Sequence, residues 1–398
     1  MELNVCPAFG STGGLTHRSA TNNNMMDRQT LLIGALMLSS ATTATDRVVS
    51  PSGTYNTISG AIAASSDGDR VLVTSGNYAE NIAIAKSLSI VPLVEGTRYT
   101  VIGYAAVNMP AGGRLLLSGI RLKEGLNTGM PHTARTEVTI VDSYLYSCSL
   151  VDPFVRVELY RDSIYTGVTL SSGAVVGNYF RGDDSNGAFA RVQGVSALPE
   201  EILMIGNSIG LPTGGGGIDL QTNSVFIVEN NFVRSSPGLP AVRVYRTGNL
   251  TAVPSSVVNN TFYKHVNSNT SAVVNGASTY FALVVKNNAL IGHGLGAVGD
   301  IGGWPQLVES HNQSVAVSAI VLSTGGPSPD SPLIDAGDPD PRYMDLDLTT
   351  NDVGCYGGSN SRANFTTAMG SAVVGFRQAP RVVSLGDPVN INAVGFDR

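Results

Sequence analysis

The sequence predicts an all-β solenoid, a parallel β-helix in which short strands stack coil upon coil. After Asp46 there is almost no helical periodicity, and short β-branched runs alternate with Gly, Asn and Ser. Only 14% of the 398 residues are charged and 46 are Gly, which argues against a disordered chain and against a helical bundle. A motif of two apolar residues, any residue and Asn recurs at steps of 29, 23, 30 and 27 residues, through Asn178, Asn207, Asn230, Asn260 and Asn287. A period of about 20–50 residues indicates a repeat architecture.

The repeated Asn selects the β-helix among repeat architectures. Asn tolerates the left-handed backbone region better than most residues, and its amide can bond to the same amide one coil above. A second apolar run follows each Asn directly, as in Tyr179–Phe180 and Phe232–Val233. We therefore expect each Asn to turn one strand sharply into the next. Propeller blades would need two-residue Asn-Gly hairpins, which are scarce here, and the framework of a leucine-rich repeat is absent.

Residues 1–45 are predicted to be a leader. The short apolar run Thr30–Leu38 follows Arg28, and small residues follow it, with the best cleavage position after Ala44. The residues before Met25 are expected to be a disordered tail or a misassigned start, and a buried helix is the alternative for the apolar run. The chain has no apolar run of the roughly 18 residues that a membrane span requires. We therefore expect an exported protein, secreted or held at the cell surface.

The body, residues 46–324, opens with a predicted cap. Residues 55–64 form a short amphipathic helix in this prediction, and the segments Gly68–Val73, Ser75–Ile82 and Lys86–Ile90 complete the first coil. The order of helix, Gly-Asp-strand, Gly-x-Tyr-x-Glu and strand resembles the start of right-handed parallel β-helix proteins of the pectin-lyase type. The resemblance implies that fold and a cover for the open end of the solenoid.

Residues 325–398 are predicted to be a C-terminal cap or anchor. The segments Ser331–Pro339 and Asn351–Gly358 are similar to the choice-of-anchor module that ends many secreted β-helix proteins. The Gly-Gly-Pro-Ser-Pro run at 325–329 is the expected boundary, and 379–383 and 389–394 are two further expected strands. Of the three cysteines, Cys148 and Cys355 are expected to be buried thiols.

The ligand groove of this fold usually lies on one sheet, whose strands here would be 190–193, 218–221, 242–245 and 272–275. Strand alternation turns the second and fourth residue of each outward. The prediction is a first row of Arg191, Asp219, Arg243 and Val273, and a second row of Gln193, Gln221, Tyr245 and Asn275. Guanidinium groups, amides and an aromatic ring suit an acidic polysaccharide, because Arg holds a carboxylate with two bonds and Tyr can lie on a sugar face. The alternative is a solvated face with an Arg–Asp–Arg salt bridge.

The sequence favours a non-catalytic extracellular protein that binds polysaccharide or serves a structural or adhesive role. The alternative is a polysaccharide lyase or glycoside hydrolase acting on an acidic glycan. A glycosidase needs two carboxylates, and Asp219 is the one acid on the predicted face. Asp183-Asp184 and Gly292-His293-Gly294 match parts of the polygalacturonase motifs but lie far apart, and the family's other motifs are missing.

Other partners are limited by charge and by residue spacing. The net charge of −6 argues against nucleic acid as a partner, and the five histidines show no metal-ligand spacing. The acid-rich segment that contains Asp335, Asp338 and Asp340 can supply oxygen ligands for calcium, with ordinary Asx turns as the alternative. No other cofactor is expected, and self-assembly of the rods stays open.

Overall fold

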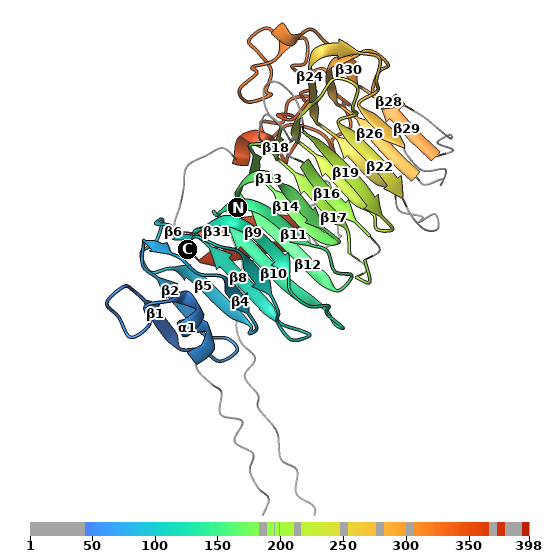
Figure 1. Cartoon of the computed structure of the whole chain (residues 1–398). Coiled ribbons are helices and arrows are strands. Elements are labelled where there is room, and N and C mark those ends of the chain that lie inside the picture. Colours follow the sequence, from blue (N-terminus) through green and yellow to red (C-terminus); the bar gives the residue numbers. More distant parts are fainter. Residues whose placement is uncertain are drawn as a thin grey trace, which may run out of the picture. The chain divides into compact units, whose positions relative to one another are not determined.

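The fold is a right-handed parallel β-helix, as predicted (Figure 1). The computed structural model describes residues 44–182, 189–194, 196–198, 200–210, 216–246, 254–275, 282–299, 306–365, 372–378 and 392–397. The predicted leader up to residue 43 lies outside them, as do Asp183-Asp184 and residues 379–383. Within the described part no helix is long and apolar enough to cross a membrane.

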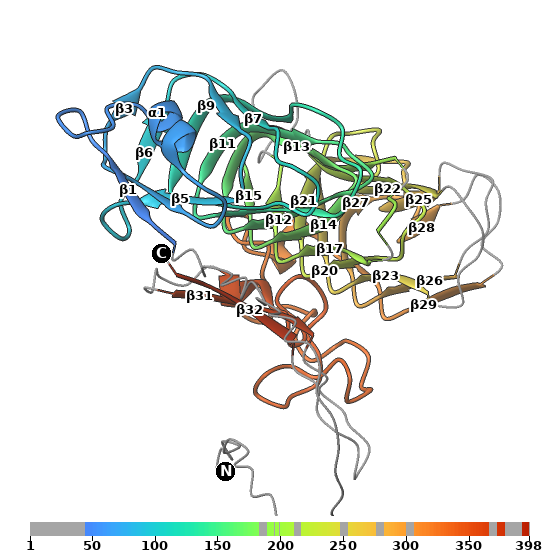
Figure 2. The same cartoon turned by 90° about the horizontal axis from the view of Figure 1, so that it is seen from below.

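One side of the solenoid is a sheet of twelve parallel strands among the described residues, one from each coil (Figure 2). In sheet order these are β1 (Asp46–Val49), β2 (Arg70–Val73), β5 (Leu88–Pro92), β8 (Arg114–Ser118), β10 (Thr136–Val141), β12 (Val155–Tyr160), β14 (Ser172–Val176), β17 (Ile202–Ile205), β20 (Phe226–Glu229), β23 (Ser255–Val258), β26 (Ala282–Lys286) and β29 (Gln306–Ser310).

The other strands complete the coils and also pair in parallel. They are β3 (Asn77–Tyr78), β4 (Ile82–Ile84), β6 (Tyr99–Val101), β7 (Ala105–Val107), β9 (Ile120–Thr128), β11 (Tyr144–Leu150), β13 (Ser163–Leu170), β15 (Tyr179–Phe180), β16 (Phe189–Gln193), β18 (Ser208–Ile209), β19 (Gly217–Thr222), β21 (Phe232–Ser235), β22 (Val242–Arg246), β24 (Thr261–Ser268), β25 (Val273–Asn275), β27 (Ala289–His293), β28 (Val298–Gly299) and β30 (Gln313–Ser314). Only β31 (Ala372–Gln378) and β32 (Asn392–Asp397) pair antiparallel among the described strands.

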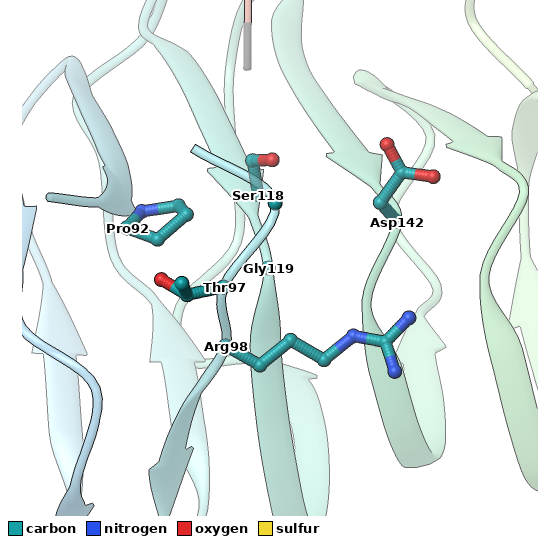
Figure 3. Close-up of a pocket in the computed structure, with 7 residues that line it drawn as sticks. Pro92, Thr97, Arg98, Ser118, Gly119 and Asp142 are labelled. Atoms are coloured by element: carbon teal, nitrogen blue, oxygen red, sulfur yellow. The ribbon is translucent and has the colours of Figure 1, made fainter. Parts of the chain in front are cut away.

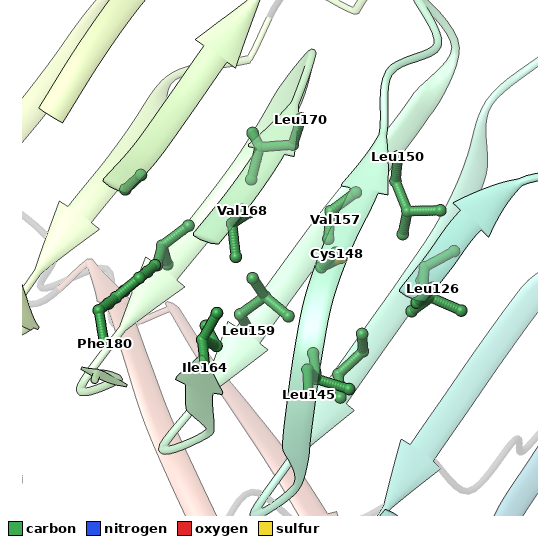
Figure 4. Close-up of a cluster of buried hydrophobic side chains, with 14 of the residues drawn as sticks. Leu126, Leu145, Cys148, Leu150, Val157, Leu159, Ile164, Val168, Leu170 and Phe180 are labelled. Carbon is green, nitrogen blue, oxygen red and sulfur yellow. The ribbon is translucent and has the colours of Figure 1, made fainter. Parts of the chain in front are cut away.

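The core is a continuous stack of inward side chains from successive coils. Figure 4 shows part of it, where Leu145 and Cys148 of β11 face Val157 and Leu159 of β12 and Ile164 of β13. Each of these side chains is essentially buried, and burying one aliphatic side chain contributes about 1.5–3 kcal/mol. Cys148 and Cys355 are buried free thiols, as expected.

The N-terminal cap is the helix α1 (Ile58–Ala64), three residues shorter than predicted at its start. The backbone N–H groups at the start of this helix and the carbonyls at its end bond to side chains of residues that follow it in the sequence. Glu80 accepts from the N–H groups of Ile58 and Ser59 at 2.7 and 2.9 Å, and the Lys86 ammonium donates to the carbonyls of Ile62 and Ala63 at 3.0 and 2.8 Å. The Glu of the Gly-x-Tyr-x-Glu motif therefore holds the start of the helix, where negative charge is favoured.

The corners after β14, β17, β20, β23 and β26 use two adjacent residues, where the sequence motif had suggested one. The first adopts a left-handed backbone, with φ of 67° and 68° at Gly177 and Gly206 and 55° at Asn230, Asn259 and Asn287. The second carries the amide ladder. Asn178, Asn207 and Asn260 are ladder residues as predicted. Asn230 and Asn287 were predicted to be ladder residues, but the ladder residues of their corners are Asn231 and Asn288. The prediction chose the wrong residue because both positions of those two corners are Asn.

The ladder itself is confirmed. From Asn207 onward, the side-chain oxygen of each ladder Asn accepts from both the backbone N–H and the side-chain amide of the Asn one coil earlier, at 2.8–3.1 Å. The second amide hydrogen reaches a carbonyl of the sheet, as from Asn231 to Met204 at 2.7 Å. The residues, in order, are Asn178, Asn207, Asn231, Asn260, Asn288 and Asn312.

Asp162 extends the ladder by one coil toward the N-terminus. Its backbone N–H donates to the Asn178 side-chain oxygen at 2.8 Å, and its own Oδ1 accepts from the Ser143 N–H at 2.7 Å. Its Oδ2 is buried without a hydrogen-bond partner. Burial raises the pKa of this carboxyl well above its usual range, and Asp142 adds a like charge that Arg98 opposes. Figure 3 shows Arg98 and Asp142 lining a small cavity outside this corner.

Residues 317–365, here called the strap, run along the side of the coils. The strap contains the first part, 325–365, of the segment that the sequence predicted to be a cap or anchor. The strap includes the short 3₁₀ turns η1 (Val317–Ala319) and η2 (Arg362–Phe365). It bonds to the left-handed corner residues. The Asn230 amide donates to the carbonyl of Gly357 at 2.6 Å, Asn259 exchanges two bonds with Asn351, and Asn287 Oδ1 accepts from the N–H of Asp338 at 2.8 Å.

Asn231→Leu tests the ladder. The substitution removes the acceptor of the Asn207 backbone N–H and of one Asn207 side-chain N–H, and the side-chain donor to the Met204 carbonyl. We therefore expect a loss of about 1–3 kcal/mol in the free energy of unfolding. Asn56→Leu, at an exposed position, is the matched control. Denaturant unfolding of the two variants is the measurement, and equal midpoints would contradict a stabilising ladder.

Asp162→Asn tests whether the buried carboxyl group of Asp162 has a raised pKa. A carboxyl whose pKa is raised on folding contributes its stability below its unfolded pKa of about 3.9 and loses it as pH rises through the folded pKa. The wild type should therefore lose stability as pH rises from about 4, and the amide variant should lack this slope and be more stable at neutral pH. Unfolding curves across pH measure both. A less stable variant at pH 7 would contradict this assignment.

Candidate functional site

The predicted groove rows are present on β16, β19 and β22. Arg191 lies beside Asp219, and Asp219 beside Arg243; Gln193, Gln221 and Tyr245 form the second row in the same register. All six side chains are exposed or half-buried, whereas Ala190, Ile218 and Val242 point into the core. The alternation rule therefore placed these six residues on the correct face.

The fourth strand was predicted one residue out of register. Arg243 pairs with Val274, and Val242 pairs with Val273, which is fully buried. Val273 therefore belongs to the core, and Asn275 lies beside Val244 rather than Tyr245. The loop lengths between coils differ, so an alignment by Asn corners shifted this strand by one position, and a shift of one residue exchanges the two faces.

A pocket of about 130 Å³ lies at the start of the first row. Its charged lining residues are Arg191, Asp219 and Arg243, and Phe189, Leu239 and Pro240 supply apolar walls. These three apolar residues were not predicted, because Leu239 and Pro240 lie in a connection between strands and Phe189 lies one residue before the predicted strand.

The charges in the pocket are only partly paired. Arg191 lies 3.3 Å from Asp219 and stacks over Phe189 with its guanidinium 4.6 Å from the ring centre. Arg243 lies 5.9 Å from the Tyr245 ring centre, and within the described chain no carboxylate is in ion-pair contact with it. Asp219 Oδ1 is buried without a hydrogen-bond partner. The salt-bridged row is thus half formed: Arg243 is a cation without an ion pair among the described residues, and one oxygen of Asp219 is buried without a partner.

Asp219 is the one acid among the residues that line this pocket. A glycosidase places two carboxyl groups about 5–10 Å apart, and the described lining supplies one. Asp183 and Asp184, the acids of the partial polygalacturonase match, lie outside the described residues. The described lining residues therefore offer two guanidinium groups, which attract negative charge, and the carboxylate of Asp219.

The three calcium candidates do not share a site. Asp338 contacts the Lys286 ammonium at 2.7 Å, and Asp340 binds the Arg342 guanidinium at 2.6 Å, which lowers the pKa of Asp340 to about 2. Asp335 instead donates its backbone N–H to Asp352. Across the part of the chain that the structure describes, no group of three or more His, Cys, Asp or Glu side chains could hold a metal ion.

A second polar pocket, of about 320 Å³, was not anticipated. It is lined by residues of β24, β27 and β30, including Ser268 and His293. Behind it lies Lys264, which is 2% exposed and bonds to the hydroxyls of Ser268 and Thr270. Burial lowers the pKa of Lys264 to about 8 and that of His293 to about 3. Lys264 lies two residues after the buried Phe262, so strand alternation turns it inward. The sequence analysis did not anticipate it, because Lys is rarely buried.

Comparison with known proteins adds one structural likeness. No protein-family model matches the chain, and no curated protein sequence matches it. Among solved structures the chain is similar to a crystal structure of the pectate lyase Pel9A, with a TM-score of 0.38 and 13% identity, over 80% of this chain and 98% of that one. The assignment of the fold rests on the strand pairing described above.

Lys264→Met tests the buried ammonium. A base whose pKa falls from about 10.4 unfolded to about 8 folded gains stability as pH rises between these values, because the unfolded chain then binds more protons. The wild type should become more stable from about pH 8 to pH 10 relative to the variant. Parallel pH dependence of unfolding for both proteins would contradict the shifted pKa of Lys264.

Proposed function

We propose that this is an exported, non-catalytic protein that binds an acidic polysaccharide along the groove of β16, β19 and β22. The observation that carries the proposal is the registered double row, with Arg191, Asp219 and Arg243 beside Gln193, Gln221 and Tyr245. Successive members lie on neighbouring strands, about 4.8 Å apart. A linear polymer that runs along the solenoid can therefore meet a guanidinium group at Arg191 and again at Arg243, two strands further on.

Arg243 is the group best suited to a uronate carboxylate. It is half-buried, is in no ion pair within the described residues, and lies beside the Tyr245 ring. A guanidinium can hold a carboxylate with two parallel hydrogen bonds, and the neighbouring ring offers an apolar surface to the sugar. Gln193 and Gln221 can bond to hydroxyl groups. The apolar walls at Phe189 and Pro240 limit where a sugar ring can enter.

The competing function is a lyase or hydrolase that uses Asp219. The observation that favours it is the unpartnered Oδ1 of Asp219 between two guanidinium groups in a pocket. Such an oxygen can accept a proton or a hydroxyl group. The single described acid favours binding over hydrolysis, because glycoside hydrolysis generally requires a second carboxyl group.

Arg243→Ala and Tyr245→Ala test the groove with polygalacturonate as the probe. We expect each to weaken binding about tenfold, which corresponds to about 1.4 kcal/mol, with little loss of stability because the side chains are outward. Arg114→Ala, an exposed Arg on β8 of the twelve-stranded sheet, is the charge-matched control. Binding should also weaken as salt rises. Unchanged affinity in both variants, measured by calorimetry, would reject the groove.

Asp219→Asn separates binding from catalysis. For a binding protein, neither the wild type nor the variant should release reducing ends or unsaturated products from polygalacturonate. Turnover by the wild type that the substitution abolishes, with binding retained, would establish the enzyme instead.

A further inference from the structure

We propose a second polysaccharide-binding surface, the tyrosine band, on the face next to the groove. It consists of Arg121, Lys123, Tyr144, Tyr146, Tyr165 and Tyr179, and its ligand is an acidic glycan. The inference does not rest on the groove, because it uses different residues, different strands and a different observation. That observation is a cluster of exposed aromatic rings interleaved with unpaired cations.

Strand pairing brings these residues together from four successive coils. Arg121 of β9 lies beside Tyr144 of β11, which lies beside Ser163 of β13, and Ser163 in turn beside Tyr179 of β15. Two residues further along β11 and β13, the rings of Tyr146 and Tyr165 stack with their centres 5.4 Å apart and their planes 27° apart. The result is two parallel columns that follow the axis of the solenoid.

The four tyrosine rings of the band are exposed or half-buried, although clustered aromatic rings are uncommon on a protein surface. Tyr146 is 42% and Tyr179 is 46% exposed, and Tyr144 and Tyr165 are half-buried. The same column continues through Ser208 to Phe232, where it is fully buried by the strap. The strap thus covers this face of the solenoid at Phe232 and leaves it open at the tyrosines. Exposed aromatic clusters of this kind mark interaction sites.

The charge around the rings indicates an acidic partner. The Arg121 guanidinium lies 5.2 Å from the Tyr144 ring centre, and Lys123 and Arg181 are exposed beside the columns. None of these three cations is in ion-pair contact with a carboxylate of the described residues. The exposed acid Glu124 directly follows Lys123 in the sequence. Tyr rings can lie against the apolar face of a sugar while the cations meet its carboxylates.

Single-stranded nucleic acid is the competing occupant, because stacking platforms with nearby cations also bind bases. The overall charge of −6 disfavours it, since nucleic-acid affinity depends mainly on neutralising many phosphates. The band has two cations among its four rings and Arg181 beside them, which matches a polymer with alternating ring faces and carboxylates better than a continuous phosphate backbone.

The band and the groove lie on two faces that meet on one strand. The first residues of β13, Ser163 and Ile164, pair with β15, whereas Gly167 to Leu170 pair with β16. The bend lies between them. Tyr165 is therefore close to the bend, and a polysaccharide chain on the band need not touch Arg243 or Tyr245.

The experiment compares a Tyr146→Ala/Tyr165→Ala double variant with Tyr343→Ala, a half-buried Tyr of the strap, as the control. Binding is measured with polygalacturonate, neutral dextran and an oligothymidylate. We expect the double variant to bind polygalacturonate about tenfold more weakly with an unchanged melting temperature, and Lys123→Gln to weaken it in the same direction.

The outcomes separate the two surfaces. An Arg243→Ala effect without an effect of the double variant or of Lys123→Gln would overturn the band and leave the groove standing. An effect of the double variant without one at Arg243 or Tyr245 would support the band and overturn the groove. Dextran bound as tightly as polygalacturonate, or oligothymidylate bound more tightly, would overturn the acidic-glycan assignment.

Discussion

The hydrogen-bonded corner is the constraint on which the rest of the structure depends. A left-handed residue turns the chain, and the next residue ties that turn to the coil above through the ladder. Because the ladder fixes where each coil ends relative to its neighbours, it also fixes the register of the following strands. A displacement of one residue would turn Arg191, Asp219 and Arg243 into the core. The surface chemistry of the molecule therefore depends on buried amides.

The corner also explains why the repeated motif could be recognised but not fully interpreted. Its left-handed position is Asn where the strap accepts or donates side-chain bonds, at 230, 259 and 287, and Gly at 177 and 206, where a Cβ would collide with the Phe365 ring. Neighbouring coils thus present Gly-Asn or Asn-Asn. The sequence shows an Asn in every case, and only the long-range contact distinguishes its two positions.

Alternation within a strand was enough to predict six groove residues, because it is a local rule. It failed at Val273, where the correct register depends on the connection that precedes the strand, and it could not reveal the tyrosine band. Tyr146 and Tyr165 meet across two coils of unequal length and lie beside a bulge. The apolar walls at Leu239 and Pro240 come from a connection between strands, where no periodic pattern exists.

The strap gives the solenoid a mechanical property that stacking alone would not. Each coil of a repeat protein contacts only its neighbours, so such chains can open from one end. Here residues 317–365 bond to the coils of Asn287, Asn259 and Asn230 and reach Gly206 and Gly177. Those coils should open as one cooperative unit, and the contacts named here all join the strap to coils that follow Asp162. Under tension the rod would then yield first at its N-terminal half, on the side that carries Arg121 and Tyr144.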